Sequence, residues 1–296
     1  REVAPFPFCG PLWTSSRPSG TFRDMTPPPS LTNTPSVFFP FEEPRLEAIF
    51  LGRRKRFLAD MRLMAPLPEQ PGSPPRGAAP EAALGPGAAL ETVSFCANTG
   101  TMKGCLFPGA RCILWDVNRP KRKLRTTWRA IEGPEAWIGV DTGVPNRLAA
   151  MAIAAGVVPA LAGYERILTE RKLGEHSRVD LLLESGEGEA ARCCWVEVKN
   201  VTLVEGGVAR FPDAVTLRGL KHLRELSARV EAGDRAAMLY IIQRADGQRF
   251  EPAADIDPAY ANGLREAVAA GVEAFALRCE VSPLGVRTKA LVPITL

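Results

Sequence analysis

Two stretches of sequence give the strongest indication of the fold: Arg178-Val179-Asp180-Leu181-Leu182-Leu183 and Cys193-Cys194-Trp195-Val196-Glu197-Val198-Lys199. A loop rich in Gly and Glu lies between them. Both runs are short and dominated by apolar and β-branched residues, so they predict two neighbouring β-strands. Because alternate residues of a strand share a face, Glu197 and Lys199 project together, while the valines on either side of Glu197 point the other way.

An acidic residue followed by acidic-x-Lys on the next strand resembles the core of restriction-endonuclease-like phosphodiesterases. Asp180 and Glu197 would hold a hard divalent cation, Mg²⁺ or Mn²⁺, and Lys199 would orient the attacking water or stabilise charge on the phosphorane. Glu170, on an expected strand over 164–171, is a further candidate metal ligand, with an exposed strand glutamate as the alternative. Since Glu-x-Lys also occurs as a solvated ion pair on many sheets, activity as a Mg-dependent phosphodiesterase or nuclease stays open on this pattern alone.

Length and composition predict a folded protein of two domains. The chain has 296 residues, of which 46% are hydrophobic, enough for a substantial core. The longest uncharged run, 148–164, is short and interrupted by Pro159, so it predicts a buried helix and no membrane span. Seven cysteines without paired spacing fit a reducing compartment. Cys96, Cys105 and Cys112 are expected to be structural thiols, because the chain has only two histidines to complete a zinc site.

Positive charge is concentrated in the first half of the chain. Residues 45–145 contain 15 Lys/Arg against 9 Asp/Glu, whereas residues 146–296 contain 19 against 20. Stackable rings, Phe57, Trp115 and Trp128, lie near the basic clusters. Cations beside aromatic rings are typical of a surface that binds nucleic acid; the alternative is a solvated basic rim that favours solubility. The clusters are Arg53, Arg54, Lys55 and Arg56, and then Lys121, Arg122, Lys123 and Arg125.

Composition divides the chain into three parts. Residues 1–44, rich in Pro, Ser and Thr, are expected to be a disordered tail or an organellar targeting segment. Residues 45–145 predict a small barrel or sandwich, with a Pro/Gly/Ala-rich insertion at 65–89 in a hairpin loop. Residues 146–296 predict an α/β sheet covered by helices. The expected strands are 46–51, 56–63, 91–96, 111–117, 127–131, 136–141, 165–171, 178–184, 193–203, 236–243 and 272–281, and the expected helices are 146–155, 216–231 and 258–270.

The helix expected over 216–231 carries both apolar and basic side chains. Leucines at every third position from Leu217 to Leu226 suggest the buried stripe. Arg218, Lys221 and His222 are then expected on the other face, where they would reach phosphates beside the metal site or, alternatively, would simply be solvated.

Several motifs together resemble the sugar fermentation stimulation protein A family over residues 46–296. The resemblance implies an OB-like β-barrel followed by a nuclease-like α/β domain of the restriction-endonuclease, PD-(D/E)XK, type, in a DNA-binding protein linked to regulation of maltose metabolism. It also implies that Asp180, Glu197 and Lys199 form the nuclease-type core. Residues 1–44 and 65–89 have no counterpart in the family pattern. The motifs are Arg53–Asp60, Cys96–Cys105, Asn146–Leu148, Ser177–Asp180, Val196–Lys199, Phe211–Ala214 and Arg218–Leu223.

The family pattern also includes the loop Asn98-Thr99-Gly100. With Gly104 four residues further on, the loop offers main-chain N–H groups and positive φ angles, a geometry that can wrap an anion. A tight turn between strands without a ligand is the alternative.

The leading hypothesis is a DNA-binding protein with little sequence preference, whose second domain places DNA against a latent or active divalent-metal site. A binding-only regulator with a catalytically silent nuclease-like fold is the alternative, and a sugar- or nucleotide-responsive protein without a nucleic-acid role is a third. No membrane partner is expected. A cytoplasmic location is expected for a bacterial protein and a plastid location if residues 1–44 are a transit segment, while the oligomeric state is left open.

Overall fold

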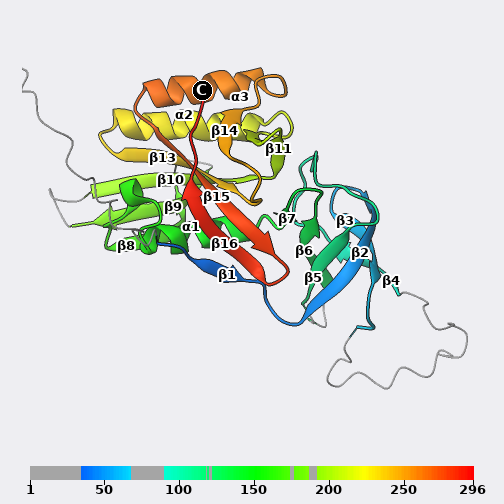
Figure 1. Cartoon of the computed structure of the whole chain (residues 1–296). Helices are drawn as coiled ribbons and strands as arrows, with labels where there is room; N and C mark the ends of the chain where they lie inside the picture. The colour runs from blue at the N-terminus through cyan, green and yellow to red at the C-terminus, as the bar shows by residue number, and fades with distance from the viewer. Residues whose placement is uncertain (1–34, 68–89, 118, 120–121, 174–176, 187–191) are drawn as a thin grey trace, which may run out of the picture. The chain divides into compact units, whose positions relative to one another are not determined.

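A closed five-stranded barrel precedes an α/β region (Figure 1). The computed structural model describes residues 35–67, 90–117, 119, 122–173, 177–186 and 192–296. Thr34–Leu296 forms one compact unit, so the barrel and the α/β region belong to the same body. No helix in these described ranges is long and apolar enough to cross a membrane.

The barrel is closed by pairing between its two end strands. Phe95 in β4 lies opposite Thr127 in β6 in a parallel pair, which completes the order β4-β3-β2-β5-β6. Phe50 and Trp128 stack inside it with ring centroids 4.9 Å apart, and Trp128 is 0% exposed. The expectation that Trp128 offers a ring to nucleic acid is therefore wrong, because the ring fills the barrel core. The strands are β2 (Arg45–Arg54), β3 (Leu58–Leu63), β4 (Glu91–Phe95), β5 (Arg111–Asp116) and β6 (Thr126–Glu132).

The insertion expected at 65–89 falls in the connection between β3 and β4. These two strands pair antiparallel, so the segment does link the arms of a hairpin, as predicted. Residues 68–89 lie outside the described part of the chain.

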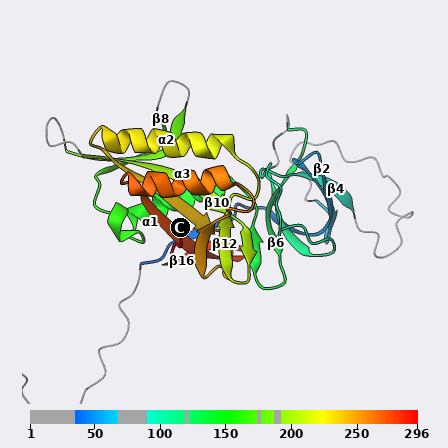
Figure 2. The same ribbon diagram turned by 90° about the horizontal axis from the view of Figure 1, so that it is seen from above.

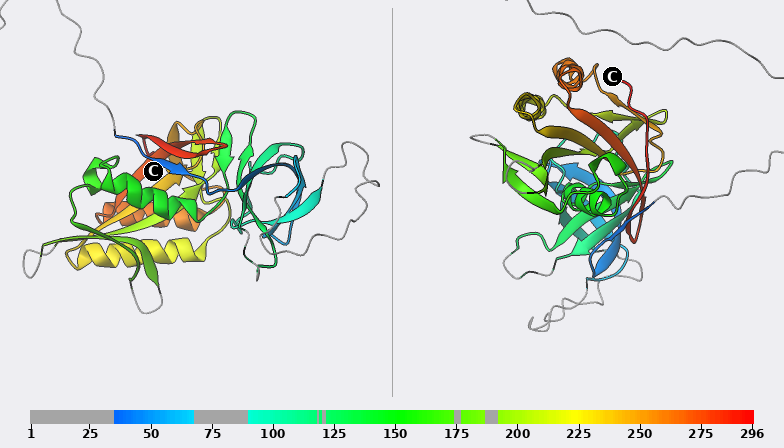
Figure 3. Two further views of the ribbon diagram at one scale, coloured as in Figure 1. Left: turned by 90° about the horizontal axis from the view of Figure 1, so that it is seen from below. Right: turned by 90° about the vertical axis from the view of Figure 1, so that its left-hand side faces the viewer.

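The α/β region contains a mixed sheet with helices on both faces. Its order is β7-β15-β13-β10-β9-β8. Strands β10, β13 and β15 run parallel to one another, β9 is antiparallel to β10, and β8 is antiparallel to β9. Helix α1 packs on one face, whereas α2 and α3 lie side by side on the other (Figures 2 and 3). The strands are β7 (Trp137–Gly139), β8 (Arg166–Lys172), β9 (Arg178–Ser185), β10 (Arg192–Val201), β13 (Arg235–Ile242), β15 (Glu273–Ser282) and β16 (Gly285–Leu291); the helices are α1 (Val144–Ala154), α2 (Leu217–Glu231) and α3 (Pro258–Ala269).

Three short strands and one helical turn, none of them predicted, complete this region. β11 (Leu203–Glu205), β12 (Val208–Phe211) and β14 (Arg249–Pro252) form a small separate sheet, and η2 (Pro159–Leu161) is a 3-10 turn after α1. The small sheet follows directly after β10, so it lies at the end of the strand that carries Glu197 and Lys199.

Side-chain alternation along β10 explains why this strand is central. Val196 and Val198 pack into the core under α1, whereas Trp195 and Val201 pack into the core under α2 and α3. A strand buried on both faces needs apolar residues on both. Glu197 is therefore placed on the α2 side, as an acidic residue within a hydrophobic layer.

Helices α2 and α3 begin at side-chain caps. Thr216 Oγ1 accepts the Gly219 N–H at 3.0 Å, and Asp257 Oδ1 accepts the Tyr260 N–H at 3.0 Å. These caps satisfy N–H groups that have no partner within the helix, and they fix where each helix starts. The predicted helix boundaries are accordingly close to the observed ones.

The predicted apolar stripe of α2 is only partly correct. Leu217 is 81% exposed, whereas His222 is 3% exposed and lies with Leu223 and Leu226 on the buried face. A helix turns by about 100° per residue, so leucines at every third position drift around its surface. Leu217 therefore ends almost opposite Leu226.

Residues 35–44 are ordered, contrary to the expectation of a disordered tail over residues 1–44. Strand β1 (Phe38–Pro40) pairs with β16, with Phe39 opposite Val286. Phe39 and Phe41 are buried in the core under α1. Residues 1–34 lie outside the described part of the chain.

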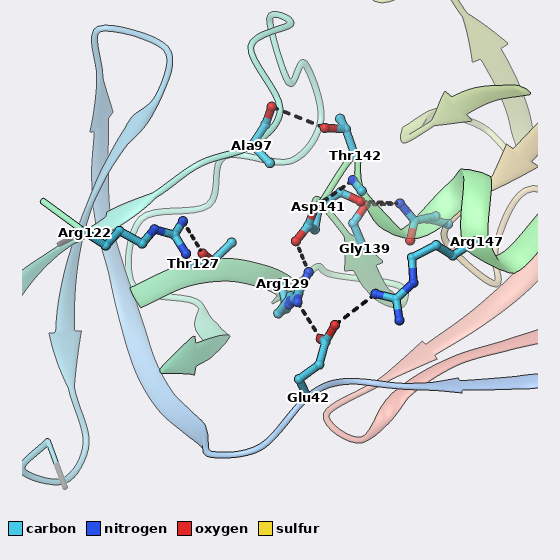
Figure 4. Close-up of polar contacts among 11 residues, drawn as sticks. Glu42, Ala97, Arg122, Thr127, Arg129, Gly139, Asp141, Thr142 and Arg147 are labelled. Carbon is cyan, nitrogen blue, oxygen red and sulfur yellow. Dashed lines mark hydrogen bonds and ion pairs between the residues drawn. The ribbon is translucent and has the colours of Figure 1, made fainter. Parts of the chain in front are cut away.

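An ion network that is buried at Arg129 and Asp141 joins this segment to the barrel and to α1 (Figure 4). The Arg129 guanidinium, on β6, donates to the carboxylates of Asp141 and Glu42, and Arg147 on α1 donates to Glu42 at 3.1 Å. Arg129 also covers the Trp115 ring at 4.7 Å from its centroid. The network holds the barrel at the start of the α/β region.

Candidate functional site

Asp180 lies where β9 and β10 separate. Their antiparallel pairing ends at Val196 opposite Leu181, one residue short of Asp180. Beyond that point the Val198 N–H donates to Asp180 Oδ2 at 2.8 Å instead of to a strand carbonyl, and Asn146 Nδ2 from α1 donates to Oδ1 at 2.7 Å. The separation of the strands thus leaves room for the Asp180 carboxylate. The Val198 N–H and the Asn146 amide orient this carboxylate.

Glu197 offers one satisfied and one unsatisfied oxygen. The residue is 2% exposed, and its Oε1 contacts both Lys199 Nζ and His222 Nδ1, which are 3.5 Å from each other. Its Oε2 is buried and has no hydrogen-bond partner among the described residues. Buried polar atoms almost always have a partner, and an exception calls for an explanation such as a bound ion.

The pKa values of Asp180 and Glu197 are shifted in opposite directions. Burial raises the pKa of Asp180 to about 6, and the nearby charge of Glu197 adds to the rise. Burial also pushes the pKa of Glu197 upward, but the hydrogen bond from His222 and the charge of Lys199 outweigh it, so that this pKa is lowered. Above pH 6 both groups are therefore ionised, and their mutual repulsion favours a bound cation.

A cavity of about 450 Å³ gives access to these groups. It is lined by residues of the barrel as well as of the α/β region, so a ligand at the carboxylates also meets the barrel. Side chains that could contact such a ligand are Asn98, Asn146, Asp180, Glu197, Lys199, Arg210, Asp213 and Arg218.

The residues that follow Asn98-Thr99-Gly100 in the same loop, Thr101 and Met102, hold an anion, and that anion belongs to this chain. Asp213 Oδ2 accepts the Met102 N–H at 2.8 Å and the Thr101 hydroxyl at 2.9 Å. Positive φ angles occur in this loop at Met102 and Gly104, and not at Gly100. Thr99 is exposed. The loop therefore fastens the barrel to the turn that precedes α2.

Arg53 supports the same loop from within the barrel. Its guanidinium donates to the carbonyl of Asn98 at 2.7 Å and to that of Gly100 at 3.0 Å, and the Gly100 N–H donates to Asn98 Oδ1 at 2.9 Å. The prediction that Arg53 is free to contact phosphate is therefore wrong, because its donors are occupied by main-chain carbonyls.

Removing the Asp213 carboxylate tests this fastening. Asp213→Ala leaves the buried Met102 N–H without its acceptor, which is expected to lower the free energy of unfolding by about 2 kcal/mol. Amide exchange at Met102 is expected to accelerate, because its N–H then opens to solvent. Asp213→Asn retains one carbonyl oxygen and is the control, with a smaller loss; equal exchange at Met102 in all three proteins would contradict the fastening.

Three more of the predicted DNA-binding residues of the barrel have side-chain partners within the protein. Arg54 is paired with Asp60 at 2.9 Å, and Arg125 donates to Asp116 at 2.8 Å. Arg122 donates to Thr127 at 2.9 Å.

Three other predicted DNA-binding residues of the barrel are available for contacts. Lys55, Arg56 and Lys123 are exposed, and none of their side chains has a partner among the described residues. Lys55 and Arg56, with φ of 52° and 61°, form the turn between β2 and β3, next to Phe57, which is 45% exposed. Lys121 lies outside the described part of the chain.

Two further predictions need correction. Glu170 is exposed, has a φ of 54° and lines a different cavity from Asp180 and Glu197, so it does not join them as a metal ligand. Across the described ranges no three His, Cys, Asp or Glu side chains come together as a metal site. His222 is not on the exposed basic face of α2; it is buried against Glu197 because it shares a face with Leu226. Arg218 and Lys221 are exposed, as predicted.

Comparison with known proteins agrees with this architecture. Residues 51–140 match the family model "SfsA N-terminal OB domain", and residues 143–285 match "Sugar fermentation stimulation protein RE domain". The chain belongs to the sugar fermentation stimulation protein family. The predicted family and the predicted order of an OB-like barrel and an α/β domain are thereby confirmed.

Relatives of this family cover most of the chain. The sugar fermentation stimulation protein homolog of Geobacter sulfurreducens is 51% identical over 201 residues, 68% of this chain and 84% of that protein. The homolog of Allorhizobium ampelinum is 44% identical over 257 residues, 86% of this chain and 98% of that protein. The solved structure of Pyrococcus furiosus SfsA in complex with Ca²⁺ has a TM-score of 0.71 and 25% sequence identity, and the match covers 88% of this chain and 99% of that one.

Proposed function

We propose that this SfsA-family protein binds DNA with little sequence preference and, with a divalent cation held by Asp180 and Glu197, hydrolyses phosphodiester bonds. The observation that carries the proposal is the buried, unpartnered Oε2 of Glu197, a residue that lines the same cavity as Asp180 and whose charge acts on the Asp180 carboxylate. The relative solved with Ca²⁺ supports a divalent cation at this fold. Carboxylate oxygens suit Mg²⁺ and Mn²⁺, which are the ions proposed for the chemistry.

The chain's own side chains have distinct proposed roles. Asn146 and the Val198 N–H orient Asp180, and His222 holds Glu197 through Oε1, which leaves Oε2 without a partner. Lys199 Nζ stabilises negative charge that develops on the phosphate during attack. A bound Mg²⁺ or Mn²⁺ supplies an activated water and neutralises phosphate charge.

DNA binding is supported by four exposed cations, Arg218 and Lys221 on α2 and Lys55 and Arg56 on the β2–β3 turn. Arg218, Lys55 and Arg56 have no side-chain partner among the described residues, and Lys221 faces Glu225 at 3.6 Å. Phosphates pair with such cations, and the exposed ring of Phe57 beside the turn offers a stacking surface for a base. Regulation of maltose metabolism, which the family resemblance implies, would act through this DNA binding.

Binding without cleavage is the second candidate. It is favoured by the ion pair that ties Lys199 to Glu197 and by the small number of free ligands. Three carboxylates are among the described residues that line the cavity, and that of Asp213 already accepts from Thr101 and Met102. In that case the same cavity would hold a cation and a phosphate without chemistry. Either candidate fits the cytoplasmic location expected for a bacterial protein, which stays a prediction.

A cleavage and binding assay on single-stranded, duplex and branched DNA tests the proposal. With Mg²⁺ or Mn²⁺, the wild-type protein is expected to cut at least one form, and Asp180→Ala/Glu197→Ala is expected to retain binding and lose cleavage. Glu266→Ala/Glu280→Ala removes two exposed carboxylates outside the cavity and is the charge-matched control. Intact DNA with the wild-type protein in both metals would leave binding only, and affinity that does not fall with salt would count against DNA binding itself.

A further inference from the structure

We name the cavity that Asp180 and Glu197 line the metal cavity. A second cavity, of about 650 Å³, shares Arg218 with it. Its lining comes from three elements: β8 and β9, which form adjacent antiparallel strands, and α2. We name it the basic groove, after the four cations Lys172, Arg178, Arg218 and Lys221.

Positive charge exceeds negative charge in the basic groove. Among the described residues that line it there are four cations and one carboxylate, that of Glu170. Lys172, Arg178 and Arg218 are exposed and have no hydrogen-bond or ion-pair partner among the described residues. Lys221 faces Glu225 Oε1 at 3.6 Å, an oxygen that also accepts the Ser177 hydroxyl. Cations held close together without partners attract an anion of several charges.

His222 connects the basic groove to the metal cavity. Its Nδ1 contacts Glu197 Oε1, while the residue also lines the basic groove. Arg218 lines both cavities. An anion in the basic groove would therefore be separated from the Glu197 carboxylate by a single residue, His222, on the α2 side of the sheet.

We propose that the basic groove binds the phosphodiester backbone of a polynucleotide strand, next to the phosphate that lies at Asp180 and Glu197. This assignment rests on the proposed function and extends it from the metal site to the path of the strand. The cations come from three elements and continue into the metal cavity through Arg218, which suits a row of phosphates better than one phosphate group. Lys172 and Arg178 are the residues newly assigned to this path.

Substitution of the two newly assigned cations tests the proposal. Binding of a labelled single strand of about 12 nucleotides is measured by fluorescence anisotropy, in EDTA to prevent cleavage, from about 50 to 200 mM KCl. Lys172→Gln/Arg178→Gln is expected to weaken affinity by about 10-fold at low salt. The slope of log affinity against log salt is expected to fall by about 1.4, the value for two phosphate contacts on a single strand.

The matched control removes two other exposed arginines. Arg224→Gln/Arg265→Gln changes net charge equally, but neither residue lines either cavity, so the affinity is expected to stay within about 2-fold of wild type. Thermal stabilisation by Mn²⁺ is expected to be the same in both variants, because the carboxylates are untouched.

Three outcomes would overturn the assignment. Wild-type affinity and salt slope in Lys172→Gln/Arg178→Gln would show that the strand does not use the basic groove, while the proposed function stands. Inorganic phosphate or a dinucleotide that competes at the same concentration as the strand would assign the groove to a small phosphate ligand. A wild-type protein that binds no strand would remove both the proposed function and the path built on it.

Discussion

Asp180→Asn is expected to make the metal-free protein more stable above pH 6 and, at the same time, to abolish its stabilisation by Mn²⁺. The pKa of Asp180 is raised from its ordinary value of 3.8 to about 6, so ionising this carboxylate in the folded state costs free energy. Asn keeps the shape of the neutral form and carries no charge. The variant loses one of the two carboxylates that would hold the cation.

The direction of this change in stability follows from the linkage between protonation of Asp180 and folding. Because the folded-state pKa lies above the unfolded one, the folded protein binds the proton more tightly, and wild-type stability falls as pH rises from about 4 to about 6. Asp180→Asn does not undergo this loss. Above pH 6 the variant is expected to melt about 3 °C higher than wild type without metal, with the difference shrinking at lower pH. With saturating Mn²⁺, the wild-type protein is expected to melt at a higher temperature than Asp180→Asn.

Thermal melts across pH, with and without Mn²⁺, check both effects. Asp255→Asn is the contrasting variant, because its pKa is lowered by the hydrogen bond from Arg210 and its carboxylate is exposed. It is expected to show no gain of stability above pH 6 and to keep the Mn²⁺ response. An equal Mn²⁺ response in Asp180→Asn and wild type would exclude Asp180 as a ligand.

Glu197→Gln is expected to have the opposite effect on stability, with a loss of about 3 kcal/mol in the free energy of unfolding. Its carboxylate is buried and contacts both Lys199 and His222. Replacing it with a neutral amide leaves the Lys199 ammonium, whose side chain is 14% exposed, without its ion-pair partner. Metal binding and cleavage are expected to be lost as well, because the unpartnered Oε2 is removed.

A double-mutant cycle separates these two contributions. Lys199→Met removes the ammonium, so Glu197→Gln/Lys199→Met is expected to recover much of the stability lost in Glu197→Gln. The response to Mn²⁺ is expected to stay absent in the double variant, since it concerns the carboxylate alone. Urea unfolding measures the cycle, and a coupling free energy near zero between Glu197 and Lys199 would contradict the buried ion pair.

Local sequence patterns were sufficient for most of the fold. Strands β9 and β10 follow from short runs of apolar residues, and the starts of α2 and α3 follow from Thr216 and Asp257, since these effects act over a few residues. Strand β1 could not be predicted, because three residues form a strand only where β16, from the far end of the chain, pairs with them. Such pairing leaves no local signal.

The candidate site was predictable in its carboxylates but not in their surroundings. Adjacent strands bring Asp180 and Glu197 together, whereas the burial of His222 depends on how α2 rotates against the sheet. Charge clusters show how many cations a segment has and not what they pair with. Arg53 and Arg54, neighbours in one cluster, therefore have different partners, a main-chain loop and Asp60.

The hydrogen bonds from the barrel loop to Asp213 have a consequence for how this protein can be rearranged. The turn that carries Asp213 leads directly into α2, on which Arg218 and His222 lie, so the loop holds the segment just before that helix in place. A chimaera with the barrel of another relative would have to bring a loop that fits Asp213, or replace both sides together. The two halves are thus not interchangeable modules, and each constrains the sequence that the other can accept.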